Sequence, residues 1–158
     1  MEIKVVNFNS LNLEEKIQLL QKNQNLLLKY HPDSEFVIRE YQDKNGRIYK
    51  HYIDLIKKYQ GKVVYGENFM LFFHIMKINN QDDTSEYARK RAGGEFSDDG
   101  NCLFAEYMVG KYSAKDLASL EEYFKDKKVE FISYVRHERI NSVSFAKYKQ
   151  RILKNASA

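Results

Sequence analysis

The sequence contains few of the residues that mark special architectures. Of its 158 residues, one is cysteine, one is proline, seven are glycine and none is tryptophan. A single cysteine excludes an internal disulfide framework and is typical of proteins in a reducing compartment. With so little proline and glycine, no segment resembles a flexible linker. We therefore expect a single domain that spans residues 1–158.

Long hydrophobic runs are also missing. The longest run, Phe69 to Met76, contains His74 and is far shorter than the roughly 20 residues of a membrane-spanning helix. The first residues show no charged region that leads into an apolar core, so we expect no signal peptide. These features predict a soluble, cytoplasmic protein that does not contact a membrane.

The charge balance is mildly basic. Lys and Arg number 26 against 22 Asp and Glu, and the formal net charge is +4. A dedicated nucleic-acid binder concentrates basic residues in a patch or stripe, whereas here they form small scattered clusters. Hydrophobic residues make up 43% of the chain and aromatic residues 14%, which is enough for a folded core. The composition leaves a nucleic-acid partner open without favouring it.

Neither the histidines nor the cysteine forms a recognisable metal motif. The four His include no HExxH arrangement and no pair at helical spacing, so we predict no metal site. His74 lies within an apolar run, and we expect a hydrogen-bonded core residue there.

The segment Asp99-Gly100-Asn101-Cys102-Leu103-Phe104 resembles the nucleophile motif of the ovarian-tumour cysteine proteases. That family carries its cysteine on a helix, with most of the domain after it. We therefore expect Cys102 to be a lone cysteine at the start of a buried strand.

Hydrophobic periodicity divides the first two thirds of the chain into short elements. A capping box of Asn12 and Glu15 predicts a helix that ends near Tyr30, before Pro32. The other expected elements are a strand at Ile3–Phe8, a hairpin at Phe36–Tyr49, a short helix that ends at Gln60, strands at Lys62–Tyr65 and Phe69–Ile78, and a long loop at Gln81–Asn101.

The stretch from Cys102 to Leu153 is the most informative. It predicts strands at Leu103–Val109 and Val129–Val135, joined by a helix at Ala114–Lys127 that a Ser113–Asp116 capping box begins. A second helix is expected over His137–Leu153. Strand, helix and strand in this order predict a parallel pair with a crossover helix. The fold class is therefore α/β (or α+β), with a mixed, mostly antiparallel central sheet, a parallel βαβ core and flanking helices.

The turn between the first strand and helix of this core is a candidate anion site. Backbone N–H groups of a first helical turn have no intrahelical partners, and the helix dipole favours an anion there. The turn comprises residues Met108–Ala114, and Lys111 adds a positive charge. The alternative is that Gly110 merely permits a tight turn.

The same residues resemble the core of the GNAT superfamily of acyl-CoA-dependent N-acyltransferases. The pyrophosphate loop of that family reads Arg/Gln-x-x-Gly-x-Gly/Ala, and it falls here on Val109-Gly110-Lys111-Tyr112-Ser113-Ala114. After the next strand the family carries an Asn and, seven residues later, a Tyr that often protonates the leaving thiolate. Asn141 and Tyr148 have this spacing.

The resemblance implies a GNAT-like fold and an N-acyltransferase that uses acetyl-CoA or another acyl-CoA and acts on an amine or protein acceptor. It implies catalytic roles for Tyr148, which would protonate the thiolate, and Glu106, which would take a proton from the amine. An outward-facing strand carboxylate is the other interpretation of Glu106. The residues implied in cofactor binding are Met108, Gly110, Lys111, Tyr112, Ser113, Ala114 and Asn141.

Two positions depart from the family pattern. Val109 stands where the family has Arg or Gln, and Tyr112 stands where a Gly lets the backbone approach the pyrophosphate. These departures keep two alternatives open. One is a non-catalytic binding or interaction protein on an acyltransferase-like fold, with a protein or nucleic-acid partner. The other is a small basic nucleic-acid-interacting protein of unrelated fold.

Overall fold

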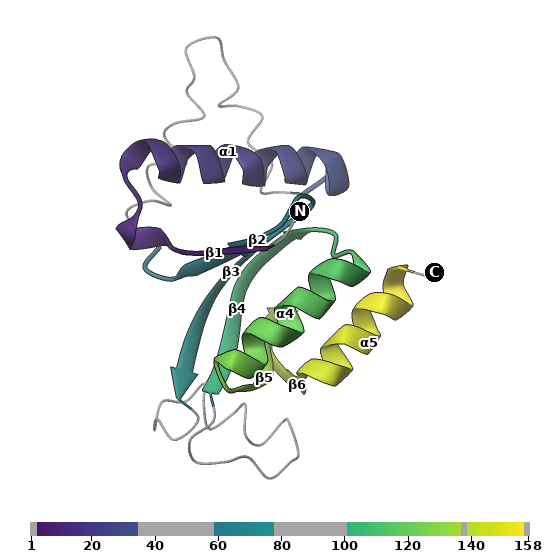
Figure 1. Cartoon of the computed structure of the whole chain (residues 1–158). Coiled ribbons are helices and arrows are strands. Elements are labelled where there is room, and N and C mark those ends of the chain that lie inside the picture. Colours follow the sequence, from purple (N-terminus) through teal and green to yellow (C-terminus); the bar gives the residue numbers. More distant parts are fainter. Residues whose placement is uncertain (1–2, 35–58, 78–100, 137–138, 157–158) are drawn as a thin grey trace. The chain divides into compact units, whose positions relative to one another are not determined.

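The structure is a computed structural model that describes residues 3–34, 59–77, 101–136 and 139–156. It contains a six-stranded mixed sheet in the order β1-β2-β3-β4-β5-β6, mostly antiparallel with one parallel pair and flanked by helices (Figure 1). The predicted fold class is therefore confirmed. The hairpin expected at Phe36–Tyr49 and most of the loop expected at Gln81–Asn101 lie outside the described residues.

Two compact units can be distinguished along the chain. The first comprises Ile3–Leu71 with Met108–Lys111, and the second comprises Phe72–Tyr107 with Tyr112–Ala158. The expectation of a single domain remains a prediction.

The first unit is built on an antiparallel strand pair. Strand β1 (Lys4–Asn7) pairs with β2 (Lys62–Tyr65), and Val5 lies opposite Val64. Val63 and Val64 are fully buried. A short 3-10 turn, η1 (Phe8–Ser10), leads from β1 towards the helix α1 (Leu13–Tyr30). Both predicted strands are confirmed.

Helix α1 begins and ends where the sequence predicts. The Asn12 side chain accepts a hydrogen bond from the Glu15 N–H, and the Glu15 carboxylate accepts one from the Asn12 N–H. This capping box satisfies two N–H groups that have no partner within the helix. The buried face carries Leu19, Leu20, Leu26 and Leu27, whereas Leu13 is exposed. Figure 1 shows the helix lying across β1 and β2.

The turn between β2 and β3 (Phe69–Lys77) is held by α1. The Gly66 N–H donates to the Phe69 carbonyl and closes the turn. From α1, the Lys22 ammonium donates to the Glu67 carbonyl at 3.3 Å and Lys29 donates to the Asn68 side-chain oxygen at 3.2 Å. The strand residues from Phe69 to Phe73 are all buried, as expected of an unbroken apolar run in a central strand.

The second unit contains the predicted βαβ core. Strand β4 (Asn101–Gly110) pairs in parallel with β5 (Val129–Arg136), and α4 (Ala114–Asp126) is the crossover. Leu103 lies opposite Ile132, and both are buried. Helix α4 buries Leu117, Leu120 and Phe124. The central topological prediction is therefore confirmed.

One element was predicted wrongly. The segment His137–Leu153 was expected to be a helix throughout, but residues Arg139–Ser144 form β6 and only Phe145–Ala156 form a helix, α5. Strand β6 pairs antiparallel with β5, and Val143 lies opposite Ile132. Ile140 and Val143, three residues apart, fit a helical period, and the ladder with β5 overrides that local signal.

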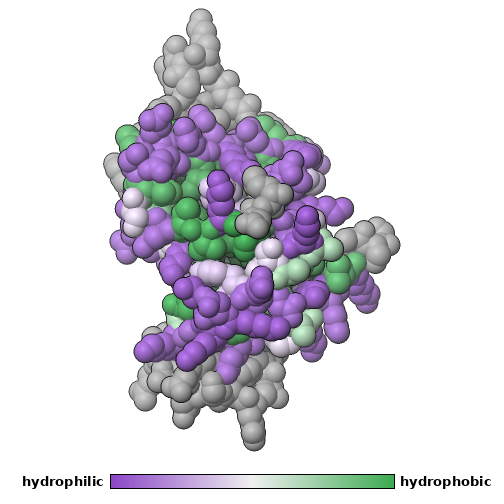
Figure 2. Space-filling model, in the orientation of Figure 1, coloured by the Kyte–Doolittle hydropathy of each residue, from purple (hydrophilic) through white to green (hydrophobic). Residues whose placement is uncertain are grey.

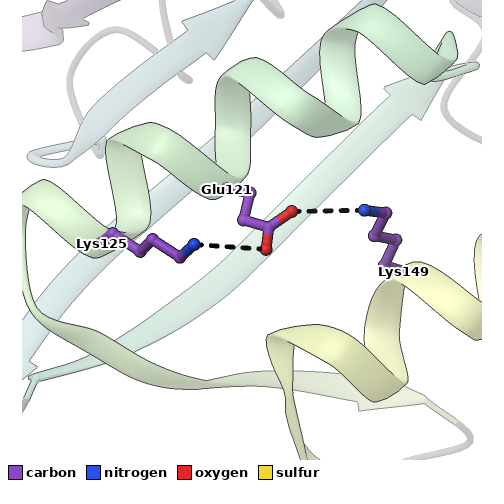
Figure 3. A network of polar contacts seen from close by, with 3 residues as sticks. All are labelled: Glu121, Lys125 and Lys149. Atoms are coloured by element: carbon purple, nitrogen blue, oxygen red, sulfur yellow. Dashed lines mark hydrogen bonds and ion pairs between the residues drawn. The ribbon is translucent and has the colours of Figure 1, made fainter.

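Helices α4 and α5 lie on the same face of the sheet (Figure 1). The Phe124 and Phe145 rings meet edge to face with centroids 5.0 Å apart. Glu121 of α4 pairs with Lys149 of α5 at 3.3 Å and with Lys125 of its own helix at 3.7 Å (Figure 3). One carboxylate therefore links the two helices in addition to their aromatic contact.

On the face that Figure 2 shows, hydrophilic side chains predominate, and hydrophobic side chains gather in its middle part. Among the residues that the structure describes, no helix combines the length and the apolar character needed to cross a bilayer.

Candidate functional site

The site begins where β4 and β5 stop pairing. Their parallel ladder runs from Asn101 to the Ala105–Tyr134 pair, whereas β4 continues beyond Ala105 and β5 continues to Arg136. Glu106 is the next residue of β4. Backbone groups at a point where two strands part can bind an extended ligand by hydrogen bonds.

The sequence-predicted Glu106 is paired with a residue that the sequence did not link to it. Its Oε1 atom lies 2.5 Å from Nε2 of His74 on β3, and the two side chains are 36% and 35% exposed. His74 is thus a partly exposed partner of a carboxylate, and the expected core position is wrong. Only the order of the strands brings these two residues together.

Two other predicted residues, Tyr112 and Tyr148, are in direct contact. Tyr112 precedes α4 and is buried, and its hydroxyl lies 3.1 Å from the hydroxyl of Tyr148 on α5. The two rings meet edge to face at 6.3 Å. Phe145 and Tyr134 also lie against Tyr148, with ring centroids at 6.3 and 6.4 Å. The candidate proton donor is therefore held inside an aromatic cluster.

Burial controls the protonation of this pair. It raises the pKa of Tyr112 well above its ordinary value. The charge that Tyr148 carries once it is ionised and the hydrogen bond with Tyr148 raise this pKa further, and the Asp116 carboxylate adds a smaller contribution. Burial also raises the pKa of Tyr148, the hydrogen bond from Tyr112 lowers it in part, and Tyr134 raises it. Both hydroxyls therefore stay protonated at neutral pH.

The start of α4 carries its own anion. The Ser113 N–H donates to the Asp116 carboxylate at 2.8 Å, and the Asp116 N–H donates to the Ser113 hydroxyl at 3.0 Å. The predicted capping box is confirmed. It uses the Ser113 amide of the proposed anion site and adds a negative charge where the helix dipole favours one. In the first turn of α4, an external anion would bind the amides of Ala114 and Lys115.

Met108–Lys111, directly before Tyr112, belong to the first unit, where Asn68 contacts Gly110 and Lys111. Gly110 has a φ of +95°, and a Cβ atom at this position would lie 2.0 Å from the Asn68 carbonyl oxygen. The Lys111 N–H donates to the same carbonyl at 2.7 Å. The predicted turn role of Gly110 is confirmed, and the Lys111 amide is occupied. Met108 lies on β4, and the Lys111 side chain is exposed.

Asn141 and Tyr148 do not share one helix as the sequence had predicted. Asn141 lies on β6 with its backbone opposite Tyr134 of β5, and Tyr148 lies on α5. Their spacing of seven residues therefore spans a strand and the start of a helix.

Cys102 lies at the start of β4 as predicted, fully buried, and not on a helix. Its sulfur is 3.3 Å from the hydroxyl of Ser133, which in turn lies 2.8 Å from the hydroxyl of Ser142. This line of polar atoms crosses β4, β5 and β6 inside the core. In the part of the chain that the structure describes, no three His, Cys, Asp or Glu residues form a group that could hold a metal.

The residues of the site fit the acyl end of an acyl-CoA better than its diphosphate. Backbone groups are available where β4 and β5 part, and Glu106 and Tyr148 are groups that can transfer protons. In contrast, the amides of Lys111 and Ser113 already have acceptors, and Asp116 adds a carboxylate at the helix start. Two of the backbone amides that the GNAT resemblance assigns to the diphosphate, those of Lys111 and Ser113, are therefore already hydrogen-bonded within the chain.

Comparison with known proteins gives limited likenesses. No family model matches the sequence, and no curated protein matches it. Among solved structures, the chain is similar to an apo agmatine N-acetyltransferase mutant, S171A, with 13% identity and a TM-score of 0.38 over 99% of this chain and 82% of that one. It is also similar to a polyamine N-acetyltransferase of Drosophila melanogaster, with 14% identity and a TM-score of 0.37 over the same shares.

Proposed function

We propose that the chain is an acyl-CoA-dependent N-acyltransferase, which moves an acyl group from a thioester to an amine. The observation that carries the proposal is the end of the β4–β5 ladder at Ala105 and Tyr134, with Glu106 directly beyond it. Amides released from a ladder can bind a thioester carbonyl and stabilise the oxyanion that develops on it. The backbone N–H groups from Glu106 to Met108 would have this role.

The proton balance assigns a role to each titratable residue. The amine nitrogen forms a bond to the carbonyl carbon, and the carbon–sulfur bond breaks. Glu106 would accept the proton that the amine loses, and Tyr148 would give a proton to the departing thiolate. Tyr148 carries this proton at neutral pH, because burial raises the pKa of its hydroxyl above the ordinary value.

The proposal also assigns the residues that would contact the rest of the acyl-CoA molecule. Asn141 would position the pantetheine arm. The exposed Lys111 side chain and the first amides of α4, from Ala114, would meet the diphosphate. Ser113 would act by beginning the helix, since its own amide is bound to Asp116. We place this protein in the cytoplasm, where acetyl-CoA and a reduced Cys102 would be available.

A binding protein without acyl-transfer chemistry is the second candidate, and the buried ring of Tyr112 favours it. This ring stands at the position of a family glycine, and it contacts the hydroxyl that would serve the leaving group. In this case the aromatic cluster around Tyr148 is structural, and the chain binds a protein or nucleic-acid partner.

Calorimetric titration with acetyl-CoA, together with thermal melts, separates the two candidates. If the chain is an acyltransferase, acetyl-CoA binds the wild type and raises its melting temperature, because a ligand of the folded state must do so. Tyr112→Gly then binds at least as tightly, since it removes a side chain from the loop. Tyr148→Phe keeps binding but slows release of the free thiol about 100-fold. Failure of both the wild type and Tyr112→Gly to bind would leave the second candidate.

A further inference from the structure

A histidine and a carboxylate from neighbouring strands meet next to the point where β4 leaves β5. Nε2 of His74 and Oε1 of Glu106 are 2.5 Å apart. About a third of each side chain is exposed, so solvent and small molecules can reach the pair. The Phe72 and Tyr107 rings, from the same two strands, meet edge to face at 5.8 Å.

This contact restricts a side chain that is otherwise mobile. A glutamate on a strand has three rotatable bonds, and fixing them costs conformational entropy. A hydrogen bond from an imidazole N–H to one carboxylate oxygen holds the group and leaves the second oxygen to face a ligand. Carboxylates that are held in advance transfer protons more effectively than freely rotating ones, because the geometry is already set.

We propose that His74 is a positioning residue, which holds Glu106 so that the carboxylate takes the proton of an incoming amine. The inference rests on the proposed acyltransferase function and extends it to a residue on β3 and to the class of acceptor. The Glu106 carboxylate is partly exposed and attracts ammonium groups, so the acceptor is a primary amine that arrives as a cation.

Each atom in this step has a destination. The ammonium gives one proton to Glu106 and becomes the neutral amine that attacks the thioester. The proton that the nitrogen loses after attack passes to water, and the thiolate takes its proton from Tyr148. No redox partner is needed. His74 makes no bond to the substrate and acts only through Glu106.

The test uses purified full-length protein, acetyl-CoA and two amines, n-butylamine and spermidine, with release of the CoA thiol as the readout. We expect Glu106→Gln to lower kcat about 100-fold without changing the Kd for acetyl-CoA. His74→Ala should lower kcat about 10-fold, with a much smaller change in the KM for acetyl-CoA. His74→Gln keeps a side-chain N–H donor and should recover most of that loss.

The matched control is His31→Gln, at the exposed residue that ends α1. It should leave kcat and KM unchanged. Melting temperatures are compared for all variants, and if His74→Ala is unstable, His74→Gln and Glu106→Gln carry the comparison with the wild type.

The outcomes distinguish the role of His74 from the proposed acyltransferase function on which it rests. If the wild type does not bind acetyl-CoA, the proposed function fails and the role of His74 fails with it. If the wild type releases thiol and His74→Ala has the same kcat, only the role of His74 is overturned. Acetyl-CoA binding without thiol release for either amine overturns the cationic-amine acceptor. Equal losses in His74→Ala and His74→Gln would overturn the hydrogen-bond explanation.

Discussion

The hydroxyl groups of Tyr112 and Tyr148 lie 3.1 Å apart, which links the residue before the cap of α4 to the first turn of α5. Tyr112 departs from the acyltransferase pattern, and Tyr148 is the residue on which the acid chemistry of that pattern would depend. Their contact means that a change at the first tyrosine alters the surroundings of the second. The two positions must therefore be tested together.

Truncation of Tyr112 should be costly to stability. The ring is 7% exposed, and removing a buried aromatic side chain typically costs about 3–5 kcal/mol. We expect Tyr112→Ala to lower the free energy of unfolding by about 3 kcal/mol, and Tyr112→Phe, which loses only the hydroxyl contact, by about 1 kcal/mol. Urea denaturation measures both. A loss below about 1 kcal/mol for Tyr112→Ala would mean that the ring does not fill the core.

The same pair predicts a loss of stability in alkali. Because burial raises the pKa of both tyrosines in the folded protein, the unfolded chain loses these protons first. The contribution of the two protonated tyrosines to the free energy of unfolding is intact below about pH 10. It decreases as the pH rises towards the pKa of each group in the folded protein, by up to about 1.4 kcal/mol per pH unit for each group. We expect the double variant Tyr112→Phe/Tyr148→Phe to show a shallower decrease between about pH 9.5 and 11.5 in denaturant titrations. Parallel curves for the two proteins would contradict this.

Gly110 should not tolerate a side chain. An added Cβ would lie 2.0 Å from the Asn68 carbonyl oxygen, and the φ of +95° is unfavourable for alanine. We expect Gly110→Ala to lower the free energy of unfolding by at least about 2 kcal/mol in urea denaturation. Asn68→Ala should not rescue it in the double variant, because the clashing atom belongs to the backbone. A rescued double variant would show that the side chain of Asn68 causes the clash.

The ion pairs of Glu121 should matter little to stability. Glu121, Lys125 and Lys149 are each more than a third exposed, and solvent screens such pairs. A double-mutant cycle of Glu121→Ala and Lys149→Ala should give a coupling energy of about 0.5 kcal/mol, which falls further in 1 M salt. A coupling above about 2 kcal/mol, unaffected by salt, would mean that the pair is shielded from solvent.

Cys102 should be replaceable by serine. Its sulfur is fully buried and faces the Ser133 hydroxyl, so a serine at 102 would still have a hydrogen-bond partner. We expect Cys102→Ser to change the free energy of unfolding by less than about 1.5 kcal/mol and to leave acetyl-CoA binding unchanged. Ser133→Ala, which leaves Ser142 without this contact, should cost more. Loss of a measured activity in Cys102→Ser with an intact fold would restore the thiol-protease hypothesis.

Local signals in the sequence predict the elements well and the contacts between them poorly. The capping boxes at Asn12 and Ser113 place the starts of α1 and α4, because these hydrogen bonds join residues three apart in the chain. Strand β6 was missed because its pairing with β5 decides its conformation.

The candidate site shows the same limit. The pairing of His74 with Glu106 depends on the order of the strands, which no spacing in the sequence records. Likewise, the departure at Tyr112 was visible in the sequence, but its contact with Tyr148 required α5 to pack beside α4.

The capping box of α4 has a consequence for any ligand of that helix. The Asp116 carboxylate is tethered to the helix it caps, so its effective concentration at the Ser113 amide is in the millimolar range or above. A phosphate from solution would compete with an anion that is covalently attached and cannot diffuse away. An anionic ligand therefore binds at the Ser113 amide only if it binds tightly enough to displace the Asp116 carboxylate, and a weak one would not.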